Sequence, residues 1–360
     1  MSLKAWDEIG MLDREVALYE RLRDRGMSIS FVTYGGSSEL DYESRVPGIQ
    51  ILCNRWGFPN RVYEQLLHRF HGKALKACDL IKTNQMNGAL MAFRCARFWE
   101  KSLISRCGYM WSQFARNESG SAAKIEKLED EIFRSAENIV VTTDEMKNNI
   151  MTRSLESNAK TVVIPNYVET DRFAPDADVE KENELLFVGR LAPQKNIVVL
   201  LSALDKVDVE TQIIGNGQLK EKVLEAVENS EGKIRWKGNV PNRELPAFMN
   251  RSSIFILPSL YEGHPKTLIE AMSCGLPVIG TDSPGIKELI DHGVNGYLCG
   301  TDSESIENAI EELISRPKLR KKLGRNARQF TVENFSLDRI VEMELELYRE
   351  ILERKKHQLS

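Results

Sequence analysis

Short apolar runs alternate with longer amphipathic stretches along most of the chain. Residues 27–34 (MSISFVTY), 139–142 (IVVT) and 161–165 (TVVIP) are apolar runs of strand length. Residues 12–25 (LDREVALYERLRDR) repeat apolar positions at helical spacing and end at Gly26. Strands that alternate with helices predict a parallel sheet with helices on its faces, which is the α/β class.

The same alternation continues over both halves of the chain. In the first half we expect further strands over residues 49–53, 80–83 and 103–105, and helices over 63–78, 90–99 and 122–135. In the second half we expect strands over 184–188, 210–214, 233–237, 253–257 and 278–281, and helices over 196–204, 218–228, 244–250 and 265–273. The polar segment 171–183 separates the two series and predicts a linker. We therefore predict two α/β domains with a cleft between them, and ligands at the carboxyl ends of the strands.

The first residues depart from a doubly wound domain, which normally opens with a buried strand and a glycine-containing turn. Gly10 suits that turn, but residues 1–8 (MSLKAWDE) are too polar to form a strand buried on both faces. Either the first strand is absent, or the sequence begins downstream of the natural start.

Length and composition indicate an ordinary globular protein. The 360 residues suit two domains, and with 42% hydrophobic and 28% charged residues the chain is neither disordered nor collagenous. The formal net charge of −4 gives no reason to expect a nucleic-acid partner. No apolar run approaches the ~20 residues of a membrane-spanning helix, and the first residues lack a signal-peptide pattern. The six cysteines and five histidines form no ligand-spaced pair, which predicts a reducing cytoplasm and no metal site.

Residues 45–116 are strongly basic, with twelve Lys and Arg against three Asp and Glu. Aromatic residues such as Trp56, Phe70 and Trp99 are interleaved with these cations. Two interpretations stay open. The cations form the solvated faces of ordinary amphipathic helices, or they make a surface for an anionic acceptor or an anionic membrane, to which each nearby Lys or Arg adds ~1 kcal/mol.

Two glycine turns follow strands of the second half. In GRLAPQK, Gly189 allows the backbone to approach a ligand closely, while Arg190 and Lys195 place two cations ready for a diphosphate. The alternative is a pair of solvated cations beside a tight turn. Gly215 opens a second turn, GNG, but the third glycine of a dinucleotide fingerprint would fall at Lys220. We expect either a plain turn or one that brings a strand end close to a ligand.

The most informative stretch is PSLYEGHPKTLIEAM, which follows the apolar run at residues 253–257. Pro265 suits the first turn of a helix, so the free amides around residues 263–267 form an anion site with the helix dipole behind it. Glu262 precedes that helix and Glu270 lies in its second turn. A carboxylate accepts two hydroxyl hydrogen bonds at once, so each Glu suits a vicinal diol on a sugar or a ribose. The alternative for such a pair is a solvated helix face.

These stretches resemble the donor domain of the family-4 retaining glycosyltransferases, also called glycosyl transferases group 1, whose fold is GT-B. The resemblance is carried by FVGRLAPQKN, IIGNGQL, YEGHPKTLIEAMSCGLPVI and GIKELIDHGVNGYL, and by the spacing of Glu262 and Glu270. AENIVVTT and VVIPNYVETDRFAP resemble the approach to the interdomain hinge, and FSLDRIVEMELELYREIL resembles the final helix of the family.

The resemblance implies two Rossmann-like doubly wound parallel-sheet domains that face each other across a cleft. Residues 1–170 would be the acceptor-side domain, with its first strand missing, and residues 171–335 the nucleotide-sugar donor domain. Residues 336–360 would form the helix that crosses back to the first domain.

The resemblance also implies residue roles. Arg190 and Lys195 bind the donor diphosphate and neutralise it as it leaves, Glu262 holds hydroxyls of the transferred sugar, and Glu270 holds the ribose. The implied donor-binding set is completed by Gly189, Gly263, His264, Pro265, Lys266, Thr267, Gly215, Lys237 and Gly238.

Two positions on the acceptor side depart from the family. Its glycine-rich turn after the first strand is reduced to Gly10, and its usual histidine near LISRCGYMW aligns with Cys107. A thiol replaces imidazole hydrogen bonding poorly. On the acceptor side Arg106 could therefore supply a cation, and Asn84 or Gln85 could supply an amide.

The implied reaction is metal-independent transfer of a hexosyl-type sugar from a UDP- or GDP-sugar to a glycan or lipid-linked acceptor, with retained configuration and no cofactor. The leaving phosphate accepts the acceptor's proton, so catalysis is mostly positioning and charge stabilisation. We expect a cytoplasmic protein with peripheral contact to an anionic membrane through residues 45–116. Two alternatives stay open: a catalytically impaired nucleotide-sugar binding subunit, and a nucleotide-sugar epimerase of the same fold.

Overall fold

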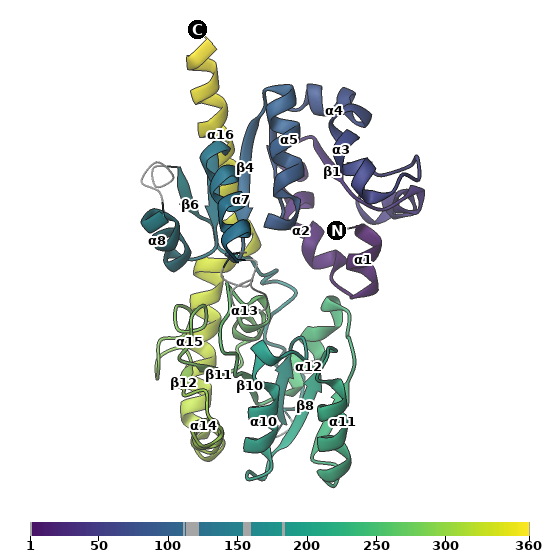
Figure 1. Ribbon diagram of the computed structural model, residues 1–360. Helices are drawn as coiled ribbons and strands as arrows, with labels where there is room; N and C mark the ends of the chain where they lie inside the picture. Colours follow the sequence, from purple (N-terminus) through teal and green to yellow (C-terminus); the bar gives the residue numbers. More distant parts are fainter. Residues whose placement is uncertain (1, 111, 113–121, 154–159, 182–183, 360) are drawn as a thin grey trace. The chain divides into compact units, whose positions relative to one another are not determined.

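The computed structural model describes residues 2–110, 112, 122–153, 160–181 and 184–359 (Figure 1). The chain divides into two compact units, which are described separately. Unit 1 consists of Met1–Pro165 and Ile340–Ser360, and unit 2 consists of Asn166–Arg339. In the part of the chain that the structure covers, no helix is long and apolar enough to cross a bilayer.

Unit 1 is built on parallel strands, as the alternation of apolar runs predicts. Strands β1 (Ile29–Val32) and β2 (Ile49–Leu52) pair with each other. A second ladder has the order β3 (Leu80–Lys82), β4 (Ser102–Cys107), β5 (Asn138–Val141), β6 (Thr161–Val163). All of β5 is buried, which explains the apolar run at residues 139–141 after Asn138.

The helices of unit 1 connect and cover these strands. They are α1 (Leu3–Glu8), α2 (Leu12–Asp24), α3 (Asn60–Phe70), α4 (Gly72–Ala77), α5 (Ala89–Trp99), α7 (Ala122–Ser135), α8 (Asp144–Arg153) and most of α16 (Leu337–Leu359), with 3-10 turns at Ser37–Arg45 and Met86–Gly88. The single helix predicted over 63–78 was wrong, since the chain breaks at His71 between α3 and α4. The polar start forms α1, which Ser2 caps by accepting a hydrogen bond from the Ala5 amide.

Helix α16, the yellow helix of Figure 1, is tied to the strands of unit 1 by buried charges. Lys82 on β3 donates to Glu344 Oε1 at 2.5 Å, and Arg106 on β4 lies 3.6 Å from the same oxygen. The Lys82 ammonium also donates to the Tyr348 hydroxyl at 3.1 Å. Burial alone would raise the pKa of Glu344, but the two cations outweigh it and lower that pKa. The helix is therefore held by an ionised carboxylate in the interior of the unit.

Unit 2 contains a parallel sheet with the order β12-β11-β10-β7-β8-β9. The strands are β7 (Glu184–Val188), β8 (Glu210–Ile214), β9 (Ile234–Lys237), β10 (Ile254–Leu257), β11 (Val278–Thr281) and β12 (Tyr297–Cys299). The connecting helices are α10 (Ile197–Leu204), α11 (Lys220–Asn229), α12 (Leu245–Arg251), α13 (Lys266–Ser273), α14 (Ser303–Ser315) and α15 (Pro317–Phe335). The chain order runs outward from β7 on one side and from β10 on the other, which is a doubly wound arrangement.

The first part of the segment predicted to be a linker is packed against unit 2 instead. Phe173 is 1% exposed and belongs to the core of this unit. Its carbonyl oxygen accepts hydrogen bonds from Ser273 at 2.5 Å and from Arg328 at 2.8 Å. One buried aromatic side chain and its hydrogen bonds are therefore enough to hold this part of the predicted linker.

Candidate functional site

The candidate residues of unit 2 follow the two strands at which the sheet changes direction. Strand β7 pairs with β8 on one side and with β10 on the other. The turn at Gly189 follows β7, and the loop that carries Glu262 follows β10. Crevices at such a switch point are where doubly wound sheets bind ligands.

The glycines of the GNG turn allow one part of the backbone to pack closely on another. A Cβ on Gly215, whose φ is 133°, would lie 1.9 Å from the Gly189 carbonyl oxygen. A Cβ on Gly217 would lie 2.4 Å from the Leu191 carbonyl oxygen. The glycines of this turn are therefore required by its close packing on the neighbouring β7 turn, and approach of this strand end to a ligand stays a prediction.

Lys195 and Glu262 form an ion pair that joins the two loops. Lys195 ends the 3-10 turn Pro193–Lys195, and its side chain is 14% exposed, while that of Glu262 is 9% exposed. A half-buried pair is screened by solvent less than a surface pair. Arg190 is exposed, with its Nη2 atom 3.4 Å from Gln194 Oε1.

Gln194 holds the same two loops together, and its role was not predicted from the sequence. Its side-chain amide donates to the Tyr261 carbonyl oxygen at 2.8 Å, and its backbone carbonyl oxygen accepts from the Leu260 amide at 2.9 Å. These bonds hold the loop just before Glu262 against the turn that carries Arg190 and Lys195.

The turn at residues 283–285 supports the Glu262 loop from the other side. The Glu262 amide donates to the Pro284 carbonyl oxygen at 2.8 Å. Gly285 has a φ of 80°, and a Cβ there would lie 2.4 Å from the Glu262 carbonyl oxygen. No sequence motif predicted a site role for this turn, which holds the Glu262 loop in place.

Helix α13 starts directly after this loop, with Pro265 as its N-cap. The first amides of the helix have no intrahelical acceptor and lie at the positive end of its dipole. His264 is 6% exposed: its carbonyl oxygen accepts from Asn166 at 2.7 Å, and its ring packs edge-on against Phe335. The ammonium of Lys266 lies 5.4 Å from the centre of the Tyr167 ring.

Glu270 is buried in the second turn of α13, with 1% of its surface exposed. The side-chain amide of Asn242 donates to its Oε1 atom at 2.9 Å. Glu262 thus pairs with a cation, and Glu270 accepts a hydrogen bond from a neutral amide.

The end of β9 lies beside the GNG turn. The Trp236 indole donates to the Gly215 carbonyl oxygen at 2.9 Å, and the Lys237 ammonium lies 4.8 Å from the centre of the Phe248 ring. A Cβ on Gly238 would make only ordinary contact with Trp236, at 3.7 Å, so the packing does not require glycine there.

Two family profiles match the chain in succession. The profile described as Glycosyltransferase Family 4 matches residues 16–172, and the one described as Glycosyl transferases group 1 matches residues 168–330. The second contains the whole arrangement of Arg190, Lys195, Glu262 and Glu270.

The chain belongs to the family-4 glycosyltransferases.

Named relatives match parts of this glycosyltransferase chain. An uncharacterized glycosyltransferase of Methanocaldococcus jannaschii is 31% identical over 60% of the chain and 60% of its own length. A Campylobacter jejuni N-acetylgalactosaminyltransferase, whose name gives a glycan on PP-undecaprenol, is 32% identical over 51% of the chain and 52% of its own length. The chain thus spans about half to three-fifths of these relatives.

A solved structure confirms the expected fold. The Anabaena protein HepE, in complex with UDP, superimposes with a TM-score of 0.78 at 16% identity and covers 93% of the chain and 94% of its own length. The glycosyltransferase therefore has the GT-B fold, with two Rossmann-like parallel-sheet units.

The acceptor-side candidates of the glycosyltransferase lie in unit 1. Gly10 has a φ of 72° and joins α1 to α2, so the element that precedes it is a helix. Asn84 follows β3, and its side-chain oxygen Oδ1 accepts a hydrogen bond from the Tyr19 hydroxyl at 2.8 Å. Arg106 is 6% exposed and faces Glu344, as described above.

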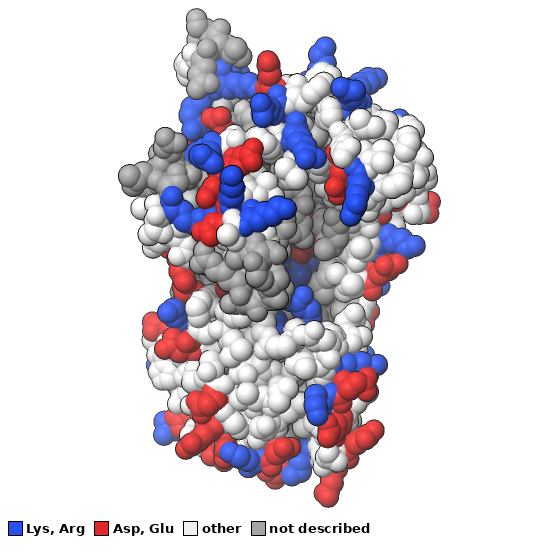
Figure 2. Space-filling view, in the orientation of Figure 1, with Lys and Arg blue, Asp and Glu red and all other residues white. Residues whose placement is uncertain are grey.

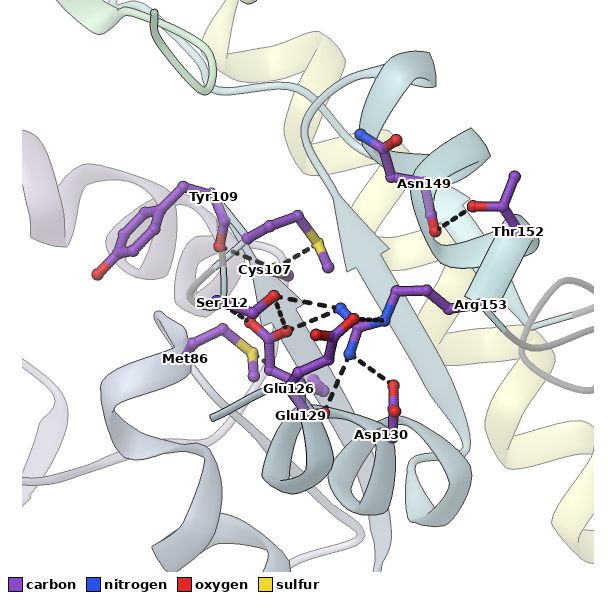
Figure 3. Close-up of polar contacts among 12 residues, drawn as sticks. Met86, Cys107, Tyr109, Ser112, Glu126, Glu129, Asp130, Asn149, Thr152 and Arg153 are labelled. Atoms are coloured by element: carbon purple, nitrogen blue, oxygen red, sulfur yellow. Dashed lines mark hydrogen bonds and ion pairs between the residues drawn. The ribbon is translucent and has the colours of Figure 1, made fainter. Parts of the chain in front are cut away.

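Cys107, at the end of β4, is fully buried (Figure 3). Its thiol donates to the Tyr109 carbonyl oxygen at 3.0 Å, and burial raises its pKa well above the usual range. The side chain is therefore a neutral thiol that faces the interior of unit 1.

A polar network next to Cys107 was not predicted. Glu129 on α7 is fully buried and accepts from the Ser112 amide at 3.0 Å, from the Ser112 hydroxyl at 2.7 Å and from Arg153 at 2.8 Å (Figure 3). Arg153 also donates to Asp130 at 2.6 Å. The network ties α7 and α8 to Ser112, five residues after the end of β4. Its members are far apart in sequence and follow no motif.

Proposed function

We propose that the chain is a retaining glycosyltransferase that moves a hexosyl-type sugar from a UDP- or GDP-sugar to a hydroxyl of a glycan or lipid-linked acceptor. The observation that carries the proposal is the pairing of Lys195 with Glu262 at the switch point, next to the start of α13. A cation, a carboxylate and free helix amides suit the diphosphate and the hydroxyl groups of such a donor. The UDP in the HepE structure and the lipid-linked glycan in the Campylobacter name support these ligand classes.

In this proposal residues 171–335 bind the donor, residues 1–170 face the acceptor, and the helix over 336–360 returns to the first domain. Donor binding exchanges the Lys195–Glu262 pair: the diphosphate takes Lys195, and the sugar hydroxyls take Glu262. After the exchange Lys195 is paired with the diphosphate and the Glu262 carboxylate accepts hydroxyl hydrogen bonds, so neither charge is left buried without a polar partner.

The chemical step then follows from charge and position. Arg190 and Lys195 stabilise the negative charge that develops on the leaving diphosphate. The acceptor hydroxyl attacks from the face that the diphosphate leaves, and a phosphate oxygen takes its proton, so no protein base is needed. Gly189, Gly263 and the amides of the α13 start hold the donor in place, and Glu270 holds its ribose. We propose that these cations replace a divalent metal ion.

A transfer assay tests the proposal. The protein is incubated with a panel of UDP- and GDP-sugars and polyprenyl-linked glycan acceptors, with and without EDTA. We expect glycosylated acceptor with retained anomeric configuration, free UDP or GDP, and similar rates in EDTA. Complete loss of transfer in EDTA contradicts the metal-independent site, interconverted sugar nucleotide indicates an epimerase, and donor binding without turnover indicates a binding subunit.

We further propose that unit 1 contacts an anionic membrane from the cytoplasmic side, where a lipid-linked acceptor would lie. Exposed apolar side chains gather on the loop before α3, on α3 and on α5: Trp56 at 39%, Phe58 at 39%, Val62 at 38% and Phe98 at 50% exposure. The Arg55 guanidinium lies 5.0 Å from the Trp56 ring centre. Aromatic side chains beside cations suit the headgroup region of an anionic bilayer.

Only some of the cations in residues 45–116 are exposed and could contact a membrane. Lys82 and Arg106 are buried against Glu344, and Arg45 pairs with Asp7 and Asp13. The cations that remain exposed on this face include Arg55, Arg61, Arg69, Lys73, Lys76, Arg94 and Arg97. In Figure 2, Lys and Arg side chains gather over the region that α3, α4 and α5 form. The proposed membrane face is therefore residues 54–76 together with α5.

A further inference from the structure

We infer that Asn242 is a positioning residue for Glu270, and that through this carboxylate it sets how strongly the site selects a ribonucleotide. The inference rests on the proposed function, in which Glu270 holds the ribose of the donor. Asn242 belongs to none of the sequence motifs; it stands in the connection between β9 and α12.

The contact between the two side chains lies in the interior of unit 2. Asn242 Nδ2 donates to Glu270 Oε1 at 2.9 Å, and each residue is 1% exposed. An ionised carboxylate only accepts hydrogen bonds, so the NH2 group of Asn242 must be the one that faces it. Removing a carboxylate from water is costly unless donors face it, and Asn242 supplies one such donor.

The backbone on both sides holds Asn242 in place. It opens the 3-10 turn Asn242–Glu244 after Pro241, whose φ is −53°. Val240 before it is 4% exposed and Leu245 after it is 1% exposed, and both belong to the core of the unit. The amide therefore reaches Glu270 from a rigid connection.

The rest of the Asn242 side chain argues against a purely structural role. Its Oδ1 atom is buried and accepts no hydrogen bond from any described residue. A buried acceptor without a donor costs free energy, so this half of the amide adds nothing to the stability of the unit. What Asn242 contributes is the fixed orientation of the Glu270 carboxylate. Two vicinal hydroxyls can bond to a carboxylate together only when its plane is held.

The test compares ribonucleotide and 2′-deoxyribonucleotide binding by calorimetry, with UDP against dUDP and GDP against dGDP. We expect the wild-type protein to prefer the ribose form of its nucleotide about tenfold, as for one hydrogen bond to a charged group. Asn242→Leu should reduce this preference to the value of Glu270→Gln. Asn242→Asp places two carboxylates in contact, and they share a proton at low pH. The preference should be lost at neutral pH in this variant and return as the pH falls.

Asn250→Leu is the matched control. Asn250 is a second buried amide of unit 2, 5% exposed, and its side chain donates to the Ala174 carbonyl oxygen at 2.9 Å. This variant should lose stability and keep the ribose preference. If Asn242→Leu likewise loses stability but keeps the ribose preference of the wild-type protein, the positioning role is wrong and the proposed function stands. If the wild-type protein binds none of the four nucleotides, both the inference and the proposed function fail.

Discussion

Arg190 and Glu262 have different positions in the site, and their substitutions should differ accordingly. Arg190 is exposed beside the β7 turn, and in the proposed mechanism Arg190→Ala removes a cation from both the bound donor and the leaving diphosphate. We expect a higher donor KM and a kcat lower by about 10²-fold, as for loss of one stabilising donor. Glu262→Gln should lower kcat with little change in donor KM, since the neutral amide still bonds to a sugar hydroxyl but no longer stabilises charge that develops on the sugar as the diphosphate leaves.

Steady-state kinetics with donor and acceptor varied separately measure both effects. Arg251→Ala, which changes an exposed arginine at the end of α12, is the control and should behave as wild type. Normal transfer by Arg190→Ala would rule out its assignment to the diphosphate.

The positions of the candidate residues next to strand ends could be predicted from the sequence. The residues that hold them in place by hydrogen bonds could not. Lys195, Glu262 and Glu270 stand in motifs for which the sequence pattern predicts a strand, a loop and then a helix. Gln194 and Asn242 support them through hydrogen bonds that span 67 and 28 residues. Such bonds depend on how strands are ordered in the sheet, and local pattern carries no information on that order.

The turn at residues 283–285 has a testable effect on the whole loop after β10. In Gly285→Ala the new Cβ meets the Glu262 carbonyl oxygen at 2.4 Å, at a φ of 80° that disfavours alanine. The loop must shift, so we expect transfer to fall more than tenfold, an order of magnitude consistent with a misplaced catalytic group. Kinetics and a thermal melt of the same sample measure the loss.

Gly293 offers a matched control for backbone strain. Its φ is 75°, and nothing lies within 4 Å of an added Cβ. Gly293→Ala should therefore lose roughly 1 kcal/mol of stability from strain and keep its activity. Equal activity loss in both variants would contradict the role of Gly285 in seating Glu262.

At the scale of elements, buried parallel strands were the easiest to predict. The run at residues 139–142 became β5, and the run at 253–257 became β10, because a strand covered on both faces is apolar throughout. Short or partly exposed elements were missed. Strand β12 has three half-buried residues and was not predicted, and the break at His71 left no strong turn signal in an otherwise helical pattern.

The buried charges around α16 should make the stability of unit 1 depend on pH. The pKa of Glu344 is lowered in the folded protein, so its contribution is present above the unfolded value of about 4.3 and is lost as the pH falls through the folded pKa. Glu344→Gln leaves Lys82 and Arg106 without their carboxylate and should cost about 3–5 kcal/mol near neutral pH. The difference from wild type should shrink below about pH 4.

Denaturant unfolding at several pH values measures this effect. Glu346→Gln, on an exposed position of the same helix, is the control and should change stability little at any pH. A Glu344→Gln protein as stable as wild type at neutral pH would show that the ion pairs do not hold α16.

The proposed membrane face is a property of the whole molecule, since it combines a loop and three helices that each carry only a few of its residues. We expect the protein to sediment with vesicles of phosphatidylcholine and phosphatidylserine and not with phosphatidylcholine alone, and to be released by salt. Substituting Arg55, Arg69 and Arg94 by Gln should weaken binding about fivefold per cation, from ~1 kcal/mol each. Phe98→Ser should weaken it further by removing a side chain that is 50% exposed.

Unit 2 supplies the matched controls for this experiment. Val294 and Val332 are 45% and 37% exposed there, so Val294→Ser and Val332→Ser remove similar apolar surface away from the basic segment. Both should bind vesicles as wild type does. Because the face lies outside the donor site, the arginine variants should keep transfer to a water-soluble acceptor while losing transfer to a vesicle-embedded one. Equal loss on both acceptors would mean that these arginines act on the acceptor glycan and not on the bilayer.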